Sequence, residues 1–215
     1  MPLNRSFARR VGKTLSTSQK ELLESDLPDY SYSNRVLLNK MAGKRVFLEI
    51  GFGMGEHFIH QASKEKDAIF IGVEAYLNGV ANVLKIAKEQ NIINILLWPD
   101  DLDLILNDLP AKILDGIYLL FSDPWPKRKH HKKRLFNKER LVILQDKLKE
   151  KGFLVFASDM DDYFESSKNI ILDNSNFQLL NKDFSQPYDS YIITKYHQKA
   201  REAGREAKFL KAIVA

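Results

Sequence analysis

The stretch RVFLEIGFGMGEH, residues 45–57, joins an almost entirely apolar run to a loop that carries a glycine at every second position. The apolar run predicts a β-strand that is buried on both faces, as in the sheets of α/β proteins. Gly51, Gly53 and Gly55 then form a strand-to-helix turn in which a ligand can approach the backbone closely. This stretch therefore predicts both a fold class and a binding site.

The same kind of apolar run recurs along the chain, and longer amphipathic segments separate the copies. Further strands are predicted at 68–75, 94–98, 115–123 and 152–159, and helices at about 56–65, 77–90, 136–150 and 160–173. Strands that alternate with helices indicate a parallel, doubly wound α/β sheet. Near the end we expect a hairpin of residues 177–184 and 190–196, followed by a closing basic helix over 199–213.

Composition and charge limit the kind of protein that these elements can build. The chain has 215 residues, no cysteine and a formal charge of +5, so it lacks disulfides and cysteine-based zinc sites. No stretch approaches the roughly 20 apolar residues of a membrane span, and the N-terminus has no apolar secretory core. We expect a cytoplasmic protein with no membrane or metal partner. Residues 1–44 are polar and basic without sustained periodicity, and predict a partly mobile N-terminal arm before a single domain over 45–215.

Acidic residues around the glycine loop distinguish between ligands. A dinucleotide fingerprint would place its third glycine where this chain has Glu56, which disfavours NAD and FAD. Glu49, just before the loop, suits a ligand with positive charge and no phosphate, and S-adenosylmethionine carries a sulfonium and an ammonium group. Glu74 follows the second strand at about the spacing at which a carboxylate reaches a ribose. After the third strand, Asp100 or Asp101 lies where adenine would bind, and one of the two is expected to be only a helix N-cap.

The stretch FSDPWPKRKHHKKR, residues 121–134, places Asp123 at the end of the fourth strand and a basic run directly after it. Carboxyl ends of parallel strands form the ligand-binding edge, so Asp123 is the best candidate for contact with a methyl acceptor. Six of the eight residues 127–134 are Lys or Arg, and we interpret them as a contact to a polyanion. The other interpretations are a nuclear localisation signal or a solvated helix start.

Together these pieces resemble the bacterial tRNA (guanine-N7-)-methyltransferase family of class I S-adenosylmethionine-dependent enzymes. The motifs EIGFGMGEH, GVEA, PDD, FSDPWPKRKHHKKR, ASD and TKY occur in that order. The resemblance implies a Rossmann-like, mostly parallel seven-stranded sheet with an antiparallel last strand. It also implies that Glu49, Glu74, Asp101 and Asp123 bind S-adenosylmethionine, together with the loop residues Gly51, Gly53 and Gly55 that the turn already indicates.

The resemblance implies that Asp123 is also the catalytic residue, and that tRNA is the substrate. The residues that it assigns to tRNA binding are Lys127, Asp159, Thr194, Lys195, Tyr196 and His197. The family commonly has Glu at the last of these positions. The basic residues near Arg9, Arg10 and Gly12 resemble the family's N-terminal segment.

The function that we expect is methyl transfer to N7 of a tRNA guanosine in the variable loop, position 46 in conventional tRNA numbering. N7 is a favourable nucleophile because its lone pair lies in the ring plane and no proton must leave, so positioning and electrostatics suffice. The other hypotheses are an amino-group methyltransferase acting on DNA or rRNA, and an RNA-binding module that has kept a methyltransferase shell. The protein is expected to be a monomer or a homodimer.

Overall fold

The computed structural model describes residues 14–215, which divide into two compact units on either side of the bond between Leu109 and Pro110. Unit 1 ends at Leu109 and unit 2 begins at Pro110. The basic residues Arg5, Arg9, Arg10 and Lys13, with Gly12, lie outside the described residues.

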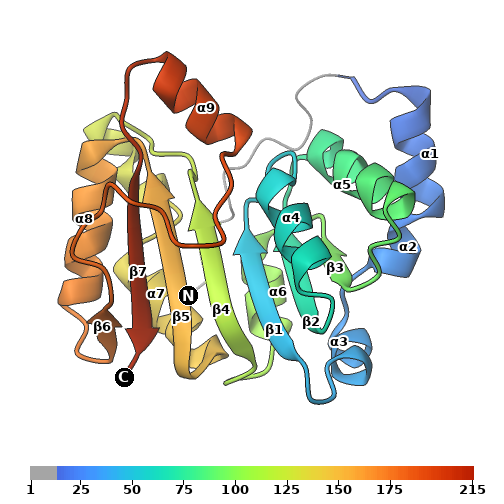
Figure 1. The fold of residues 1–215 in the computed structure, drawn as a ribbon, viewed down its shortest axis with the longest axis horizontal. Helices are drawn as coiled ribbons and strands as arrows, with labels where there is room; N and C mark the ends of the chain where they lie inside the picture. The colour runs from blue at the N-terminus through green and yellow to red at the C-terminus, as the bar shows by residue number, and fades with distance from the viewer. Residues whose placement is uncertain (1–13) are drawn as a thin grey trace. The chain divides into compact units, whose positions relative to one another are not determined.

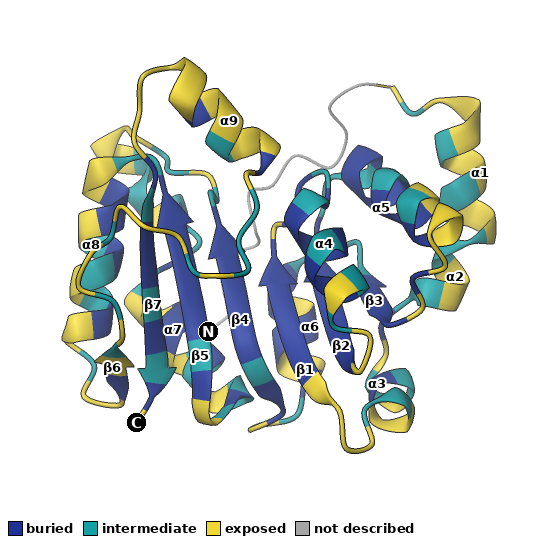
Figure 2. Ribbon diagram, viewed as in Figure 1, coloured by how far each residue is buried: buried dark blue, intermediate teal, exposed yellow. Residues whose placement is uncertain are grey.

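Unit 1 contains three parallel strands, β1 (Arg45–Ile50), β2 (Ala68–Val73) and β3 (Ile95–Trp98). They confirm the first three predicted strands. All six residues of β2 and the last five of β1 are buried, as the unbroken apolar runs predict for strands covered on both faces (Figure 2). The helices α4 (Glu56–Lys64), α5 (Leu77–Glu89) and α6 (Leu102–Asp108) follow these strands in turn (Figure 1).

Three helices occupy much of the segment that we expected to form an arm, namely α1 (Thr17–Ser25), α2 (Leu27–Tyr30) and α3 (Asn34–Lys40). A capping box between Ser16 and Gln19 starts α1, which packs against α5. The amide of Tyr32 donates to the carbonyl of Leu97, which ties the segment to β3. These helices lack a clear apolar pattern in the sequence, because among their residues only Leu37 is buried.

Unit 2 contains two parallel strands, β4 (Leu114–Leu120) and β5 (Leu148–Ser158), and two further strands, of which one runs against them. The antiparallel strand β7 (Lys208–Val214) pairs with β5 on one side and with the short β6 (Phe177–Leu179) on the other. The helices of this unit are α7 (Lys138–Lys147), α8 (Asp161–Leu172) and α9 (Lys195–Glu202), with a 3₁₀ helix, η1, at Arg128–Lys133.

The predicted hairpin and closing helix are wrong. Of residues 177–184 only Phe177–Leu179 forms a strand, and its partner is β7 instead of 190–196. Of the predicted basic helix 199–213, only the first residues are helical, because α9 ends at Glu202. Gly204 then adopts a left-handed backbone at φ +69°, and the chain continues as β7. The apolar residues from Ala207 onward fit the spacing of a helix as well as that of a strand. Only the pairing with β5 makes this segment a strand.

The strands are ordered β3-β2-β1-β4-β5-β7-β6 in one seven-stranded sheet. This order, with helices between the parallel strands and an antiparallel β7, confirms the predicted class I fold. Within residues 14–215, no helix is both long enough and apolar enough to span a membrane.

Candidate functional site

The glycine loop after β1 has a backbone that only glycine adopts easily. Gly51, Gly53 and Gly55 have φ values of +74°, +58° and +84°. A side chain in the left-handed region costs roughly 1–2 kcal/mol, so three such positions in five residues strongly favour glycine. Gly55 is also the N-cap of α4, which therefore begins at the end of the loop.

Glu74 braces this loop from the end of β2. One carboxylate oxygen accepts a 2.7 Å hydrogen bond from the amide of Gly53, and the other a 2.9 Å bond from the amide of Tyr76. The side chain is largely buried, so Glu74 is not a solvated strand-end carboxylate. Its negative charge lies directly against the glycine loop.

Helix α5 packs tightly on the other side of the loop. A Cβ atom on Gly79 of α5 would lie 1.9 Å from the carbonyl oxygen of Gly53, and one on Gly55 would lie 2.1 Å from Val83. The side-chain amide of Asn82 donates to the carbonyl of Met54 at 2.8 Å. The loop is therefore held in one shape by Glu74 and by α5.

Glu49 takes part in a buried chain of hydrogen bonds that the sequence did not reveal. Its carboxylate lies 2.6 Å from Nδ1 of His57, and Nε2 of His57 lies 3.0 Å from the side-chain nitrogen of Gln61. The exposed fractions of the three residues are 4%, 1% and 1%. The signal in the sequence is the spacing of His57 and Gln61, which puts both on one face of α4 next to the strand end.

Asp101 is the N-cap of α6, and its carboxylate accepts a 2.8 Å hydrogen bond from the amide of Asp103. We expected one of Asp100 and Asp101 to be a helix N-cap. It is Asp101, the same residue that the family pattern assigns to cofactor binding. Asp100 is exposed and accepts from the amide of Asp101 at 2.8 Å. Trp98 fixes the same turn because its indole donates to the carbonyl of Asp101.

The residues of unit 1 near the loop fit a cationic adenosine ligand better than a phosphate ligand. Segments 46–63 and 68–84 contain no Lys or Arg, whereas they contain Glu49 and Glu74. A pyrophosphate would meet negative charge here, and the sulfonium and ammonium groups of S-adenosylmethionine would be stabilised by it.

In unit 2, the segment after β4 makes an unusual turn around Asp123. Phe121 and Trp125 both have left-handed backbones, at φ +53° and +44°, although neither is glycine. Such residues persist only where their surroundings hold them, and they are concentrated at functional sites. Asp123 is exposed on this turn, between the partly buried Ser122 and Pro124.

The basic run continues from the turn into η1, and its residues divide into two groups. Lys127, Arg128, Lys129 and Lys132 are exposed, as a contact to a polyanion requires. Lys133 lies 4.7 Å above the ring of Trp125, and Arg134 is buried, with 6% of it exposed.

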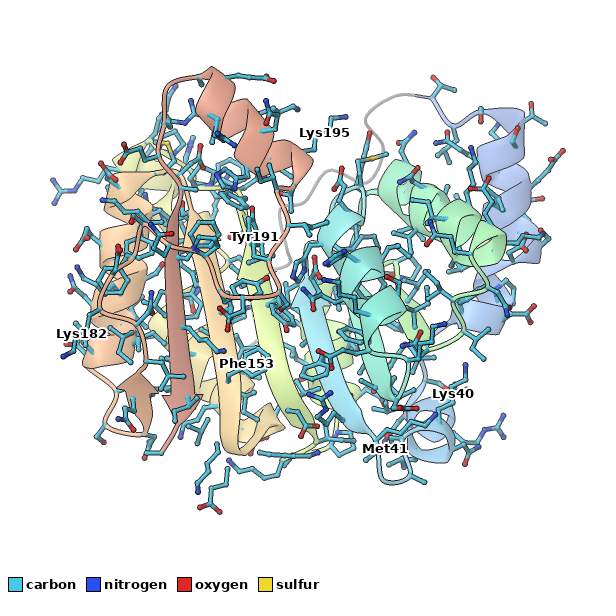
Figure 3. All side chains as sticks on the ribbon, viewed as in Figure 1. Lys40, Met41, Phe153, Lys182, Tyr191 and Lys195 are labelled. Carbon is cyan, nitrogen blue, oxygen red and sulfur yellow. The ribbon has the colours of Figure 1, made fainter. Side chains whose placement is uncertain are left out.

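The predicted tRNA-binding segment 194–197 lies at the start of α9, and its residues differ in how exposed they are. Thr194 is buried and accepts from the amide of His197 as the helix N-cap. Lys195, which Figure 3 labels, is exposed, and so is Tyr196. His197 stacks on Phe121 with ring centroids 5.5 Å apart, and its Nδ1 lies 2.8 Å from the hydroxyl of Tyr191.

Burial shifts the pKa values of Tyr191 and His197 in this aromatic cluster. It raises the pKa of Tyr191 to about 12, so this hydroxyl keeps its proton at neutral pH. It also lowers the pKa of His197, with a further lowering by the charge of Arg201 and an opposing effect of Asp159. Asp159 itself is ion-paired with Nε of Arg205 at 2.7 Å.

Comparison with known proteins adds to this geometry. The model of a family described as a putative methyltransferase matches residues 43–210. A tRNA (guanine-N(7)-)-methyltransferase of Wolbachia pipientis wMel is 37% identical over 212 residues, which cover 97% of this chain and 91% of that protein. The chain belongs to the bacterial tRNA (guanine-N7-)-methyltransferase family.

Other relatives of this methyltransferase chain are longer. A bifunctional methyltransferase of Rickettsia conorii is 60% identical over 209 residues, which cover 97% of this chain and 40% of the relative. The chain thus spans about two fifths of the length of that protein. A 16S rRNA (adenine(1408)-N(1))-methyltransferase from Catenulisporales acidiphilia has a TM-score of 0.57 at 12% identity, over 86% of this chain and 92% of that one, which shows a shared fold.

Proposed function

We propose that this protein transfers a methyl group from S-adenosylmethionine to N7 of a guanosine in tRNA, in the cytoplasm, and that the guanosine is the one at position 46 of the variable loop. The observation that carries the proposal is the exposed carboxylate of Asp123 on a constrained turn, with exposed cations immediately after it. Membership of the methyltransferase family and the likeness to tRNA (guanine-N(7)-)-methyltransferases support it.

Asp123 is the proposed catalytic residue. A carboxylate can accept hydrogen bonds from the Watson–Crick edge of guanine and so orient the base for attack by N7. Methylation of N7 makes the base cationic, and the negative charge of Asp123 stabilises that charge as it develops. The lone pair of N7 is available without loss of a proton, so a general base is not needed.

The cofactor supplies an electrophilic methyl group on a sulfonium. We assign its binding to the glycine loop with Gly51, Gly53 and Gly55, and to four carboxylates. Glu74 is suited to the ribose hydroxyls, Asp101 to the adenine end, and Glu49 and Asp123 to the cationic methionine part.

We assign tRNA binding to Lys127, Asp159, Thr194, Lys195, Tyr196 and His197. The exposed side chains of Lys127, Lys195 and Tyr196 are suited to direct contact with phosphates and bases. Thr194 acts by capping α9, and His197 acts through its stacking on Phe121, two residues before Asp123.

The decisive test is an assay of the purified protein and of Asp123→Asn with labelled S-adenosylmethionine and unmodified total tRNA. The variant keeps the size of the side chain but removes its charge, so methyl transfer is expected to fall by roughly 10²–10³-fold. Its circular dichroism and melting temperature should match those of the wild type, because Asp123 is exposed.

Nucleoside analysis and cleavage of the product tRNA identify the methylated atom. We expect 7-methylguanosine, which makes the chain cleavable by borohydride and aniline at position 46. An amino-methylated base would instead support methylation of an exocyclic amine, and turnover by Asp123→Asn close to that of the wild type would refute the role of Asp123. Calorimetry that detects no S-adenosylmethionine binding would favour an RNA-binding module without activity.

A further inference from the structure

One cation of the basic run is turned inward, and its partners surround the turn that carries Asp123. Arg134 is 6% exposed, whereas most of the other lysines and arginines of the run are exposed. Its Nε donates a 2.8 Å hydrogen bond to the carbonyl of Pro124, which is the residue after Asp123. A guanidinium used in this way is not available to RNA.

The rest of the guanidinium is held by α8 and by His131 of η1. Nη2 lies 2.6 Å from the carboxylate of Asp162 and 3.1 Å from Nε2 of His131, and Nη1 lies 3.3 Å from the hydroxyl of Ser166. The planar fork of arginine can reach Pro124 and α8 at once, which an ammonium group cannot do. Arg134 therefore links the turn after β4 to α8.

Tyr163 of α8 holds the residue on the other side of Asp123. Its hydroxyl lies 3.1 Å from the hydroxyl of Ser122 and accepts a 3.0 Å hydrogen bond from the amide of Phe136. The ring is fully buried, and the guanidinium of Arg134 lies 4.8 Å from its centroid. Ser122 and Pro124 are thus both fixed to α8, one through Tyr163 and the other through Arg134.

The backbone of the same turn needs such support. Phe121 and Trp125, the residues at its two ends, both have left-handed φ angles that side chains disfavour. A conformation of this kind is kept only by contacts that outweigh its cost, and Arg134 and Tyr163 supply them.

We propose that Arg134 is a positioning residue that holds Asp123 in its reactive place, and that it makes no contact with RNA. The catalytic part of this inference rests on the proposed function, while the structural part does not. Displacement of a reacting group by about 1 Å can lower the rate by roughly 10²-fold. Loss of the hydrogen bonds from Arg134 to Pro124 and α8 should therefore lower kcat and leave the affinity for tRNA unchanged.

The test compares Arg134→Met with Lys132→Met, since both remove one positive charge from the same run and keep an unbranched side chain. For Arg134→Met we expect a fall in kcat of roughly 10–100-fold, with the tRNA Kd and its salt dependence as in the wild type. For Lys132→Met we expect weaker tRNA binding and a salt slope that is smaller by about 0.7–0.9.

A second readout needs no activity. The chain has two tryptophans, Trp98 and Trp125, so 5-fluorotryptophan labelling gives two fluorine resonances, which Trp98→Phe assigns. Arg134→Met should shift or broaden the Trp125 resonance, and Lys132→Met should not shift it. This result would stand even if the protein methylated another atom, so failure of the inference and failure of the proposed function can be told apart.

Two outcomes would overturn the inference. One is a smaller salt slope for Arg134→Met together with an unchanged Trp125 resonance, which would make Arg134 an RNA contact. The other is unchanged kcat in Tyr163→Phe, which lacks only the hydroxyl that contacts Ser122 and the amide of Phe136, together with an unchanged Trp125 resonance in both variants. If Arg134→Met does not fold, Arg134→Lys and Tyr163→Phe provide the same comparison, and kcat in the lysine variant should stay low because lysine lacks the fork.

Discussion

At the scale of single residues, buried side chains bind Glu49 directly and fix the residues on either side of Asp123. Glu49 has His57 and Gln61 behind it, and Asp123 has Arg134 and Tyr163 around it. The exposed carboxylate of Asp123 and the acidic loop could be predicted because they belong to recognisable local patterns. The residues that bind around them are visible in the sequence, but the hydrogen bonds join separate elements, so their pairing could not be predicted from a local pattern.

The buried pair of Glu49 and His57 leads to a stability prediction. His57→Leu removes the partner of a carboxylate that is 4% exposed, and an unsatisfied buried polar group costs about 1–3 kcal/mol. We expect the urea unfolding midpoint to fall accordingly and S-adenosylmethionine binding, measured by calorimetry, to weaken.

His60→Leu is the matched control, because His60 lies on the same helix and is only partly buried. Its free energy of unfolding should stay within about 0.5 kcal/mol of the wild type. Equal stability of the two variants would mean that the Glu49–His57 bond contributes nothing to the fold.

At the scale of elements, the first part of the sheet was predictable and the last part was not. β1 to β4 and residues 152–158 of β5 consist largely of apolar runs, and their identity as strands does not depend on what they pair with. The β-branched residues of 190–196 predicted a strand, but Tyr191 instead packs in an aromatic cluster with His197 and Phe209. Thr194 then caps α9. These outcomes depend on contacts between distant residues.

The packing of α5 on the glycine loop gives a prediction for an element pair. Gly79→Ala improves the helix propensity of α5 by about 1 kcal/mol, yet its Cβ would lie 1.9 Å from the carbonyl oxygen of Gly53. Because the neighbour is backbone, the helix or the loop must move, and overpacking of this kind costs about 1–3 kcal/mol. We expect lower stability and weaker S-adenosylmethionine binding.

Lys85→Ala, at an exposed position of the same helix, is the control for an alanine substitution in α5 that does not face the glycine loop. It should leave thermal unfolding and cofactor binding close to those of the wild type. An increase in stability of Gly79→Ala would show that the loop and α5 can separate without cost.

At the scale of the whole molecule, positive charge is concentrated in one half of the chain. Residues 1–109 contain 13 Lys and Arg against 14 Asp and Glu, a formal charge of −1. Residues 110–215 contain 20 against 14, which gives +6 and accounts for the total of +5. A polyanion is therefore attracted to unit 2, while the acidic loop that suits a cationic cofactor belongs to unit 1.

This distribution predicts that tRNA binding depends more on where a positive charge lies than on the net charge of the protein. Lys129→Glu with Lys132→Glu should weaken tRNA binding and make the plot of log K against log salt less steep, by roughly 1–2 in the magnitude of its slope. Lys66→Glu with Lys112→Glu is the matched control, because it changes the net charge by the same amount at exposed positions away from the basic run. Equal effects of the two double variants on the salt slope would contradict a localised RNA contact.

The place of β7 between β5 and β6 affects how the chain can fold during synthesis. All three strands of unit 1 have been made once Trp98 is added, so that unit can assemble while translation continues. Unit 2 lacks an interior strand until Val214 has left the ribosome, and until then the edge of β5 is open to pairing with other chains. A chain cut before Lys208 would therefore contain an incomplete sheet, and its open β5 edge would make it prone to aggregation.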